Sequence, residues 1–144
     1  MEPDPRARCP ICSSLDLLGD RWTLVVMRDM LIGGRHSFSE IGADEGIATN
    51  VLTERLERLV CAEVVERLKD PSDGRRRIYV PTERGIALIP VLVELVVWGS
   101  AHTVAKTLSH VAEAAQADRA GVIASFEARA RESRAAALGE GGTD

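Results

Sequence analysis

Apolar and polar residues alternate with helical spacing along most of the chain, and one central stretch changes to a strand-like pattern. Between residues 49 and 60, Leu52, Leu56 and Leu59 recur at helical intervals while polar residues fill the opposite side. Segments 64–68 and 77–80 indicate two short strands, because residues 70–74 between them are Asp, Pro, Ser, Asp and Gly, all frequent in turns. An amphipathic helix followed by such a hairpin is typical of a reading helix and its wing.

Three helical segments are expected before this unit. Residues 13–18 predict a short helix, and residues 20–31 are apolar over most of a helical circumference, which predicts a buried central helix ending at Gly33-Gly34. Ser37 and Glu40 have capping-box spacing and predict another short helix from 38 to about 43. A helix, a short helix, a turn and an amphipathic third helix form a helix-turn-helix arrangement.

Helical patterns continue after the hairpin. Thr82 is expected to cap a helix over 83–98, which Pro90 should kink or restart and Gly99-Ser100 should end. Residues 101–138 are rich in alanine and predict further helix, interrupted at Gly121. The predicted fold is therefore mainly α with a small β-hairpin wing, a winged helix-turn-helix with N- and C-terminal dimerisation helices. We expect a winged helix-turn-helix domain over 1–99, a helical extension over 100–138 for dimerisation or as an arm, and a flexible tail over 139–144.

Composition narrows the class of protein. Hydrophobic residues make up 45% of the chain, enough to fill the core of one domain. The longest apolar run, 86–98, contains Pro90 and Glu94 and is too short to span a bilayer. Three cysteines, an odd number, argue against a secreted disulfide scaffold. We expect a cytoplasmic protein that does not interact with membranes.

The charge distribution permits DNA binding without demanding it. The net charge of −4 opposes non-specific attraction to phosphates. Within 67–77, however, five Lys and Arg residues stand against two Asp residues, so the expected wing is locally basic. This local excess places positive charge where a wing would meet DNA.

A series of residues between Cys9 and Gly99 carries a family resemblance. In chain order they are Cys9-Pro10, Leu17-Leu18-Gly19-Asp20-Arg21-Trp22-Thr23, Arg28, Leu31, Arg35, Phe38-Ser39-Glu40-Ile41, Gly46-Ile47, Leu52-Thr53, Arg55-Leu56, Leu59, Tyr79, Thr82-Glu83, Gly85, Leu88, Pro90-Val91-Leu92 and Trp98-Gly99. In this order and spacing they resemble the HxlR-type transcriptional regulators, a bacterial winged-helix family related to the MarR group. The resemblance implies a homodimer on a near-palindromic operator in double-stranded DNA, with two wings flanking two major-groove helices.

Two features depart from the family pattern. Ala48 stands where the family usually has a serine at the start of the reading helix, so Thr49 would have to supply the cap. The alanine-rich extension is also longer than in the family, and the resemblance assigns it no role.

Candidate DNA contacts lie on the reading helix, on the wing and before the short helix. On the reading helix, Asn50 suits an adenine edge, Thr49 and Thr53 suit a thymine methyl or a phosphate, and Arg55 suits phosphate or guanine. The remaining candidates are the wing residues Arg75, Arg76 and Arg77, and, before the short helix, Arg35 and Ser37. Without the helix-turn-helix context, these would be read as solvated polar positions.

The cysteines indicate a reactive thiol more than a metal centre. A zinc site at Cys9 and Cys12 would need two more ligands, and only Cys61 and three scattered histidines remain. We therefore expect no metal and no cofactor. Some relatives use a cysteine near the position of Cys9, so the resemblance implies redox or electrophile sensing by Cys9, with Cys12 beside it, whereas Cys61 is expected to pack. Buried structural cysteine is the alternative for at least one of the pair.

The second half of the chain supplies candidate dimer contacts. Val91, Leu95 and Trp98 offer apolar surface that a two-fold partner would bury. The resemblance also implies a small-molecule effector site between the central and dimerisation helices, although no residue specifies it.

The leading hypothesis is a dimeric DNA-binding regulator acting as a repressor, because a repressor needs only to occupy DNA. The alternative is a winged-helix protein-interaction module without DNA binding, which the negative net charge and Glu54 and Glu57 keep open. An enzyme is not expected, since the chain has no phosphate-binding glycine loop and no nucleophile motif with a partnered base, and hence no catalytic residue.

Overall fold

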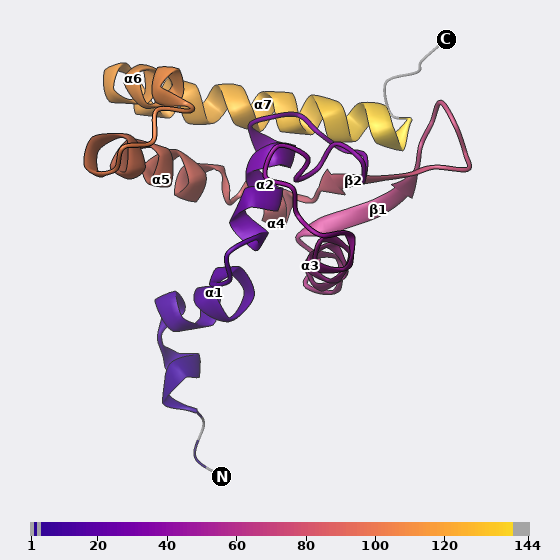
Figure 1. Ribbon diagram of the computed structural model, residues 1–144, viewed down its shortest axis with the longest axis horizontal. Coiled ribbons are helices and arrows are strands. Elements are labelled where there is room, and N and C mark those ends of the chain that lie inside the picture. The colour runs from indigo at the N-terminus through magenta and orange to yellow at the C-terminus, as the bar shows by residue number, and fades with distance from the viewer. Residues whose placement is uncertain (1, 3, 140–144) are drawn as a thin grey trace.

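The computed structural model describes residue 2 and residues 4–139, which form a mostly helical fold with a two-stranded antiparallel sheet (Figure 1). The elements in chain order are the 3-10 helix η1 (Pro5–Arg8), α1 (Pro10–Leu18), α2 (Thr23–Leu31), α3 (Thr49–Cys61), β1 (Val65–Lys69), β2 (Arg77–Pro81), α4 (Glu83–Ile86), α5 (Ile89–His102), α6 (Ser109–Ala117) and α7 (Arg119–Leu138). The expected fold class is confirmed.

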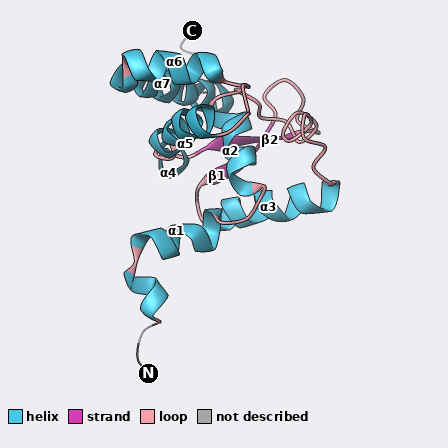
Figure 2. Ribbon diagram, turned by 60° about the vertical axis from the view of Figure 1, so that its left-hand side comes forward, coloured by secondary structure: helices cyan, strands magenta, loops and turns pink. Residues whose placement is uncertain are grey.

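The core is organised around α2, whose Val26 and Met27 are fully buried. The leucines at positions 52, 56 and 59 of α3 are also buried, which confirms the apolar face of the amphipathic helix. Helices α3 and α7 lie on opposite sides of α2 in both ribbon views (Figures 1 and 2). The polar side of α3 therefore faces away from the C-terminal helices.

The hairpin forms as expected, with strands shifted by about one residue. Strand β1 pairs antiparallel with β2, from Val65 opposite Pro81 to Lys69 opposite Arg77. An isolated bridge between Ser37 and Ile78 joins the hairpin to the segment before α3. The wing is thus attached to the helix-turn-helix unit at its base.

The expected short helix over 38–43 is wrong, because residues 38–46 form consecutive turns. Gly42 and Gly46 both have positive φ, a conformation that interrupts a right-handed helix. A Cβ on Gly42 would also lie 2.5 Å from Cδ1 of Ile47. One half of the expected capping box remains, since the Ser37 amide donates to Oε2 of Glu40 at 3.5 Å.

The helix after the hairpin restarts near Pro90 but does not end at Gly99. Thr82 caps α4 by accepting from the Gly85 amide, as expected. Pro90 lies in the first turn of α5, where a missing N–H costs no intrahelical bond. Helix α5 continues through Gly99 and Ser100 to His102, so the expected break there is wrong. Glycine only weakens a helix interior, and the flanking helical residues keep this one intact.

The C-terminal helices pack onto the domain. Helix α7 carries Phe126 and Ala130 into the core, and α6 contributes Val111, Ala112 and Ala115. The break between these helices falls at Asp118, not at Gly121 as expected. Asp118 accepts a 3.0 Å hydrogen bond from the Gly121 amide, and a Cβ at Gly121 would overlap this capping carboxylate.

Ion pairs tie α7 to the hairpin side of the domain. Arg131 makes two 3.1 Å hydrogen bonds to the Glu83 carboxylate of α4. Arg134 lies 2.8 Å from the carboxylate of Glu66 in β1 and donates to the carbonyl of Pro81 at 3.3 Å. The extension is therefore held along its length against the winged domain.

Helix α1 is the least embedded element. It has no buried residue, and it extends away from the body of the fold (Figure 2). The stretch Glu83–His102, which spans α4 and α5, is long and apolar enough to cross a membrane by length and composition, and only 28% of it is buried. Its buried residues, which include Ile86, Ile89 and Val93, belong to the domain core.

Candidate DNA-binding surface

The polar side of α3 presents three of the expected contact residues to solvent. Thr49, Asn50 and Thr53 are exposed in the first two turns, and the Thr53 hydroxyl donates to the Thr49 carbonyl at 2.8 Å. The N-cap is Ala48, which offers no side-chain hydrogen bond, so the expectation that Thr49 supplies the cap is wrong. The first amides of α3 thus have no side-chain cap and are available to an anion.

Arg55, also on α3, is held inside the protein fold. Its Nε donates to Oδ1 of Asp20 at 2.9 Å. Asp20 also accepts from the Thr23 amide at 3.0 Å and from the Thr23 hydroxyl, which starts α2. The arginine therefore joins the reading helix to the turn before the central helix.

The electrostatics of Asp20 follow from these bonds. Partial burial by itself would raise the pKa of the Asp20 carboxyl, but hydrogen bonds from Thr23 and Arg55 outweigh it and hold the pKa well below its usual range. The carboxylate is consequently charged at neutral pH and pairs fully with Arg55.

The acidic residues of α3 are partly neutralised. Glu54 forms ion pairs with Arg55 and, at 3.8 Å, with Arg58 on the next turn. Arg58 also donates to the Asp16 carbonyl of α1 at 3.0 Å. Glu57 is the other acidic residue of α3, and its exposed carboxylate has no ion pair among residues 4–139. Because Glu54 is paired, repulsion of phosphates by this helix is reduced.

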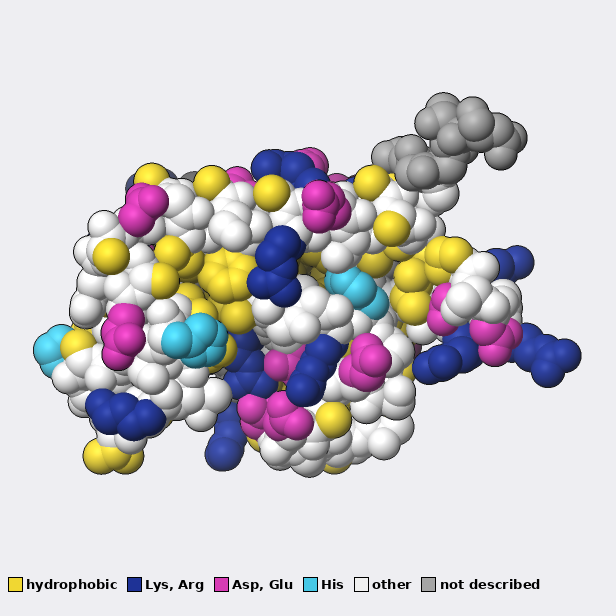
Figure 3. All heavy atoms as spheres, turned by 90° about the horizontal axis from the view of Figure 1, so that it is seen from above, with side chains coloured by type: hydrophobic (Ala, Val, Ile, Leu, Met, Phe, Trp, Pro, Cys, Tyr) yellow, Lys and Arg dark blue, Asp and Glu magenta, His cyan; other side chains and the backbone are white. Residues whose placement is uncertain are grey.

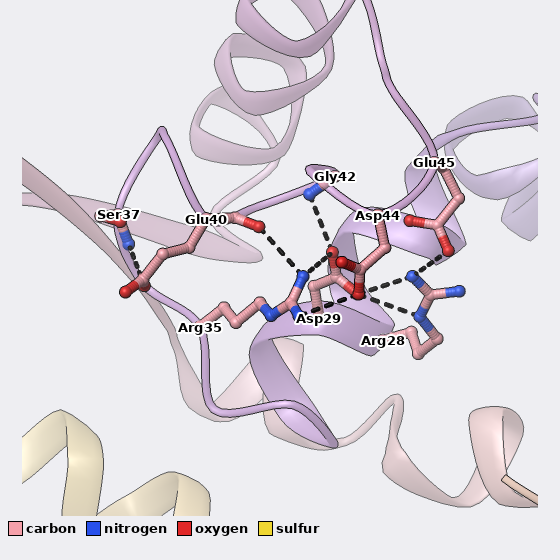
Figure 4. Close-up of polar contacts among 8 residues, drawn as sticks. All are labelled: Arg28, Asp29, Arg35, Ser37, Glu40, Gly42, Asp44 and Glu45. Atoms are coloured by element: carbon pink, nitrogen blue, oxygen red, sulfur yellow. Dashed lines mark hydrogen bonds and ion pairs between the residues drawn. The ribbon is translucent and has the colours of Figure 1, made fainter. Parts of the chain in front are cut away.

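A network centred on α2 holds the turns before α3 (Figure 4). Asp29 is 4% exposed, and its Oδ1 accepts from Nη2 of Arg28 at 2.7 Å. Its Oδ2 accepts from the Gly42 amide at 2.8 Å. Arg28 continues to Oε1 of Glu45 at 2.6 Å. One buried carboxylate therefore fixes the middle and the end of the segment that leads into the reading helix.

Arg35 belongs to this network as well. It lies 2.9 Å from the carboxylate of Asp44 and donates to the Glu40 carbonyl at 3.2 Å (Figure 4). Ser37 is half-buried, and its hydroxyl contacts the Ser39 hydroxyl at 3.3 Å. The two residues expected to meet phosphate here mainly hold the turn together.

The wing tip carries free basic side chains. Asp70 accepts from the amide and hydroxyl of Ser72, and Asp73 accepts from the Arg75 amide at 3.1 Å. Arg75 and Arg76 are exposed, and their guanidinium groups have no ion pair among the described residues. Arg77 curls back onto the Gly74 carbonyl at 3.3 Å. Basic side chains project from this edge of the molecule in Figure 3.

A groove separates the reading helix from the hairpin. It has a volume of about 480 Å³ and is lined by Thr53, Glu57 and Cys61 of α3, together with Phe38, Arg67 and Tyr79. Cys61 is exposed at its rim, so the expectation that it packs in the interior is wrong. The reading helix and the wing thus form two sides of one concave surface.

Cys9 and Cys12 lie together at the start of α1, and both are partly exposed, so neither is a buried structural cysteine. Hydrogen bonds from the Cys12 amide and thiol lower the pKa of the Cys9 thiol. Because the Cys12 thiol donates to Cys9, its own pKa is raised. Cys9 is therefore the better nucleophile of the pair.

Apolar side chains are exposed on α1 and α5. Ile11 and Leu15 of α1 are uncovered, as are the expected interface residues Val91, Leu95 and Trp98 of α5. Trp98 is 62% exposed and stacks beside His102 with ring centroids 5.2 Å apart. Trp22, by contrast, is half-buried beneath the guanidinium of Arg21.

A sequence model described as HxlR-like helix-turn-helix matches residues 17–107, well over half of the chain. The chain belongs to the HxlR-like helix-turn-helix family. The match includes α2, α3, the hairpin and α5, and ends before α6. The C-terminal pair of helices is therefore an addition to the part that the HxlR-like family shares.

Relatives in this family carry regulator names. The HTH-type transcriptional regulator Rv3095 of Mycobacterium tuberculosis is 36% identical over 86 residues, which are 60% of this chain and 54% of the relative. The chain thus matches about half the length of that mycobacterial protein. YodB of Bacillus subtilis, also an HTH-type transcriptional regulator, is 37% identical over 92 residues, 62% of this chain and 81% of YodB.

Two solved structures of similar proteins share the fold. A structure of PA1607, described as a transcription factor, superposes with a TM-score of 0.63 at 34% identity, covering 69% of this chain and 68% of that one. The reduced form of YodB superposes with a TM-score of 0.54 at 35% identity, covering 65% and 93%. Both carry the winged helix-turn-helix architecture found here.

Sequence reasoning missed the residues that hold this surface in position. Asp20 and Arg28 appeared only as members of the family pattern, with no positioning role, and Asp29 was not singled out, although Asp20 and Asp29 are acidic residues beside or within an otherwise apolar segment. A carboxylate in such a setting is rarely left without partners, and this was the available signal. Their partners lie far along the chain, so the sequence could not name them.

Proposed function

We propose that this protein is a sequence-specific DNA-binding transcriptional regulator that acts as a homodimeric repressor. The observation that carries the proposal is the concave surface between α3 and the hairpin. Thr53 of α3 and Arg67 and Tyr79 of the hairpin line this surface. Beyond the lining, Thr49 and Asn50 are exposed at the start of α3, and Arg75 and Arg76 are exposed at the wing tip without ion pairs among the described residues. A helix fits the major groove, and free guanidinium groups beside it suit the minor groove or its phosphates.

The contact residues take different roles in this proposal. Asn50 reads a base edge, Thr49 and Thr53 contact a thymine methyl or phosphate, and the uncapped amides of α3 receive a phosphate oxygen. Arg75 and Arg76 supply phosphate contacts, with Arg77 at the base of the wing. The internal bonds of Arg35, Ser37 and Arg55 favour a positioning role, with any DNA contact from Arg35 and Arg55 made by the remaining N–H groups.

The homodimer is supported by the apolar faces of α1 and α5. Exposed leucine, isoleucine and tryptophan side chains on both helices are the kind of surface that a two-fold partner buries. A dimer would carry two reading helices and therefore match a near-palindromic operator. The exposed face of Glu83–His102 would then lie in a protein interface.

A thiol signal is supported by the position of Cys9. Its pKa is lowered, and it starts the same helix that offers Ile11 and Leu15 to a partner. YodB has been solved both reduced and after treatment with diamide, a thiol oxidant. We propose that modification of Cys9, with Cys12 beside it, alters dimer geometry and releases DNA.

The test is a mobility-shift titration with sites selected from random DNA, comparing the wild type with Arg75→Ala/Arg76→Ala and with Asn50→Ala. The wing variant should bind at least about tenfold more weakly and show a shallower dependence on salt. Asn50→Ala should lose discrimination at a single base position. Arg131→Ala, on the opposite side of the fold, is the matched control and should leave affinity unchanged.

The protein-interaction module remains the competing function. It predicts that selection yields no enriched sequence and that the wing variant behaves like the wild type at every salt concentration. Because the control variant removes one arginine without touching the concave surface, a loss shared by the wing variant and the control, with Asn50→Ala unaffected, would point to non-specific charge alone.

A further inference from the structure

A second concave site lies on the opposite side of the molecule, where the C-terminal helices meet the end of α2. It has a volume of about 750 Å³, which is in the range of small-molecule sites. Its walls include Ile32, Val111, Val122, Ser125, Phe126 and Arg129. Figure 3 shows this face as a hollow with hydrophobic side chains at its base and basic side chains beside it.

The cavity is chemically polarised. At one end, the Arg129 guanidinium carbon lies 5.6 Å from the centroid of the Phe126 ring, and this arginine has no ion pair among residues 4–139. At the other end, the carboxylate of Asp118 accepts a hydrogen bond from the Gly121 amide. Asp118 and Arg129 are eleven positions apart in the chain, about 16 Å at the helical rise. The exposed His110 is the other titratable group in the lining.

We propose that this cavity binds a small amphipathic organic acid, with its apolar body against Phe126 and Val122 and its anionic group on Arg129. An aromatic face beneath a guanidinium holds the cation in place, so the arginine is oriented before an anion arrives. A neutral ligand of the same shape gains only the apolar contact. The site lies largely on α6 and α7, outside the part of the chain that the family shares.

The cavity also touches the segment that positions the reading helix. Gly33 lines it, and the next turn of the chain carries Arg35, whose amide donates to the Asp29 carbonyl at 2.9 Å. Asp29 in turn holds Gly42. An occupant that shifts the end of α2 would therefore shift the start of α3. This regulatory consequence, a change in DNA affinity on ligand binding, rests on the proposed function.

Binding is tested on the full chain without DNA, using the fluorescence of 8-anilinonaphthalene-1-sulfonate, which combines an apolar body with an anion. The wild type should bind it saturably, and octanoate should displace it more effectively than 1-octanol does. Arg129→Gln should weaken binding about tenfold, the effect of losing one charge-assisted contact. Arg131→Gln, which removes an arginine of α7 paired with Glu83, should bind like the wild type.

A cavity-filling variant separates this site from the exposed faces of α1 and α5, which also attract the dye. Ala114→Trp should remove most of the saturable signal while circular dichroism stays unchanged. Equal binding by Arg129→Gln and the wild type, or equal displacement by octanoate and 1-octanol, would overturn the proposal.

Regulation is measured second, by repeating the DNA titration at saturating octanoate. A change in DNA affinity of about threefold or more in the wild type, absent in Arg129→Gln, supports the regulatory step. Unchanged affinity overturns that step and leaves the ligand site standing. Failure of DNA binding under every condition would count against the proposed function, because the ligand measurement does not involve DNA.

Discussion

At the scale of single residues, two carboxylates hold the reading helix and the turns before it in place. Asp29 is buried within α2, and Asp20 lies just before it, yet each accepts from groups on other segments of the chain. Such carboxylates are stable inside a protein only when their hydrogen bonds are satisfied. Substitution of either should therefore disturb the reading helix without touching DNA.

The first prediction concerns Asp20. Its pKa is below the ordinary value of about 4, so its contribution to stability is fully present above that value and is lost as the pH falls toward the folded pKa. Asp20→Asn should cost on the order of 2 kcal/mol at pH 7, and the difference from the wild type should shrink below about pH 4. Urea denaturation followed by circular dichroism across this range measures both.

Asp44→Asn is the control for that series. Asp44 is mostly exposed and pairs only with Arg35, so its loss should cost under about 1 kcal/mol. A difference between Asp20→Asn and the wild type that persisted unchanged to pH 2 would show that the cost is steric, since protonation of Asp20 in the unfolded chain should by then have removed most of an electrostatic difference.

The second prediction concerns the two N-terminal cysteines. Hydrogen bonds from Cys12 lower the pKa of Cys9, so iodoacetamide near neutral pH should modify Cys9 several times faster than Cys12. Mass spectrometry of timed digests gives both rates in one sample. Cys61 serves as the exposed reference, and a Cys9 no faster than Cys61 would remove the basis for thiol sensing.

At the scale of elements, the reading helix and its approach are secured by tertiary contacts more than by local signals. Helix α3 starts without a side-chain cap, and the turns before it take the place of a second helix. What fixes them is the bond from the Gly42 amide to Asp29 and the ion pair of Arg55 with Asp20. The element is therefore well formed despite a weak start.

The third prediction tests whether α7 is part of the domain. Phe126 is almost fully buried in the common core, so Phe126→Ala should lower the free energy of unfolding by about 3 kcal/mol. Unfolding should remain a single transition, because the core is shared by α2, α5 and α7. Denaturant unfolding watched by circular dichroism tests both statements.

Val104→Ala is the matched control on a side chain that is 96% exposed, and its midpoint should equal that of the wild type. Two separate transitions in Phe126→Ala, one of them at the wild-type midpoint, would instead make the extension an independent unit.

At the scale of the whole molecule, the surfaces are divided by side. The groove between α3 and the hairpin lies on one side, while the C-terminal helices cover the opposite side of α2 (Figure 1). Apolar faces on α1 and α5 remain for a partner. This division would let one chain carry out the three proposed bindings, to DNA, to a second copy and to a small ligand, on separate surfaces.

The fourth prediction concerns the dimer. Leu95→Glu/Trp98→Glu places two charges in the proposed interface, where burial of an unpaired charge is strongly unfavourable. The variant should sediment as a folded monomer at micromolar concentration, where the wild type sediments as a dimer. Leu138→Glu, on an exposed apolar position of α7, should leave the dimer intact. A wild-type monomer at this concentration would contradict the homodimer itself.

The sequence by itself determined the central helix, the reading helix and the hairpin, and the face that the reading helix buries. The periodic leucines of α3, the turn residues at 70–74 and the glycines after α2 are local signals, and each element they predict is present. Solvent exposure of Thr49, Asn50 and the wing arginines followed from the same patterns, because an amphipathic face is set by spacing alone.

Only the tertiary structure decided how the surface is held. Local spacing predicted a capped helix over 38–43. The positive φ of Gly42 and Gly46 and the hydrogen bond from the Gly42 amide to Asp29 make this segment a series of turns. Likewise Arg55 lies beside the buried leucine face of α3, and its partner Asp20 is 35 residues earlier in the chain. Partners so distant in sequence meet only after folding, and so does the cavity that α6 and α7 complete against the end of α2.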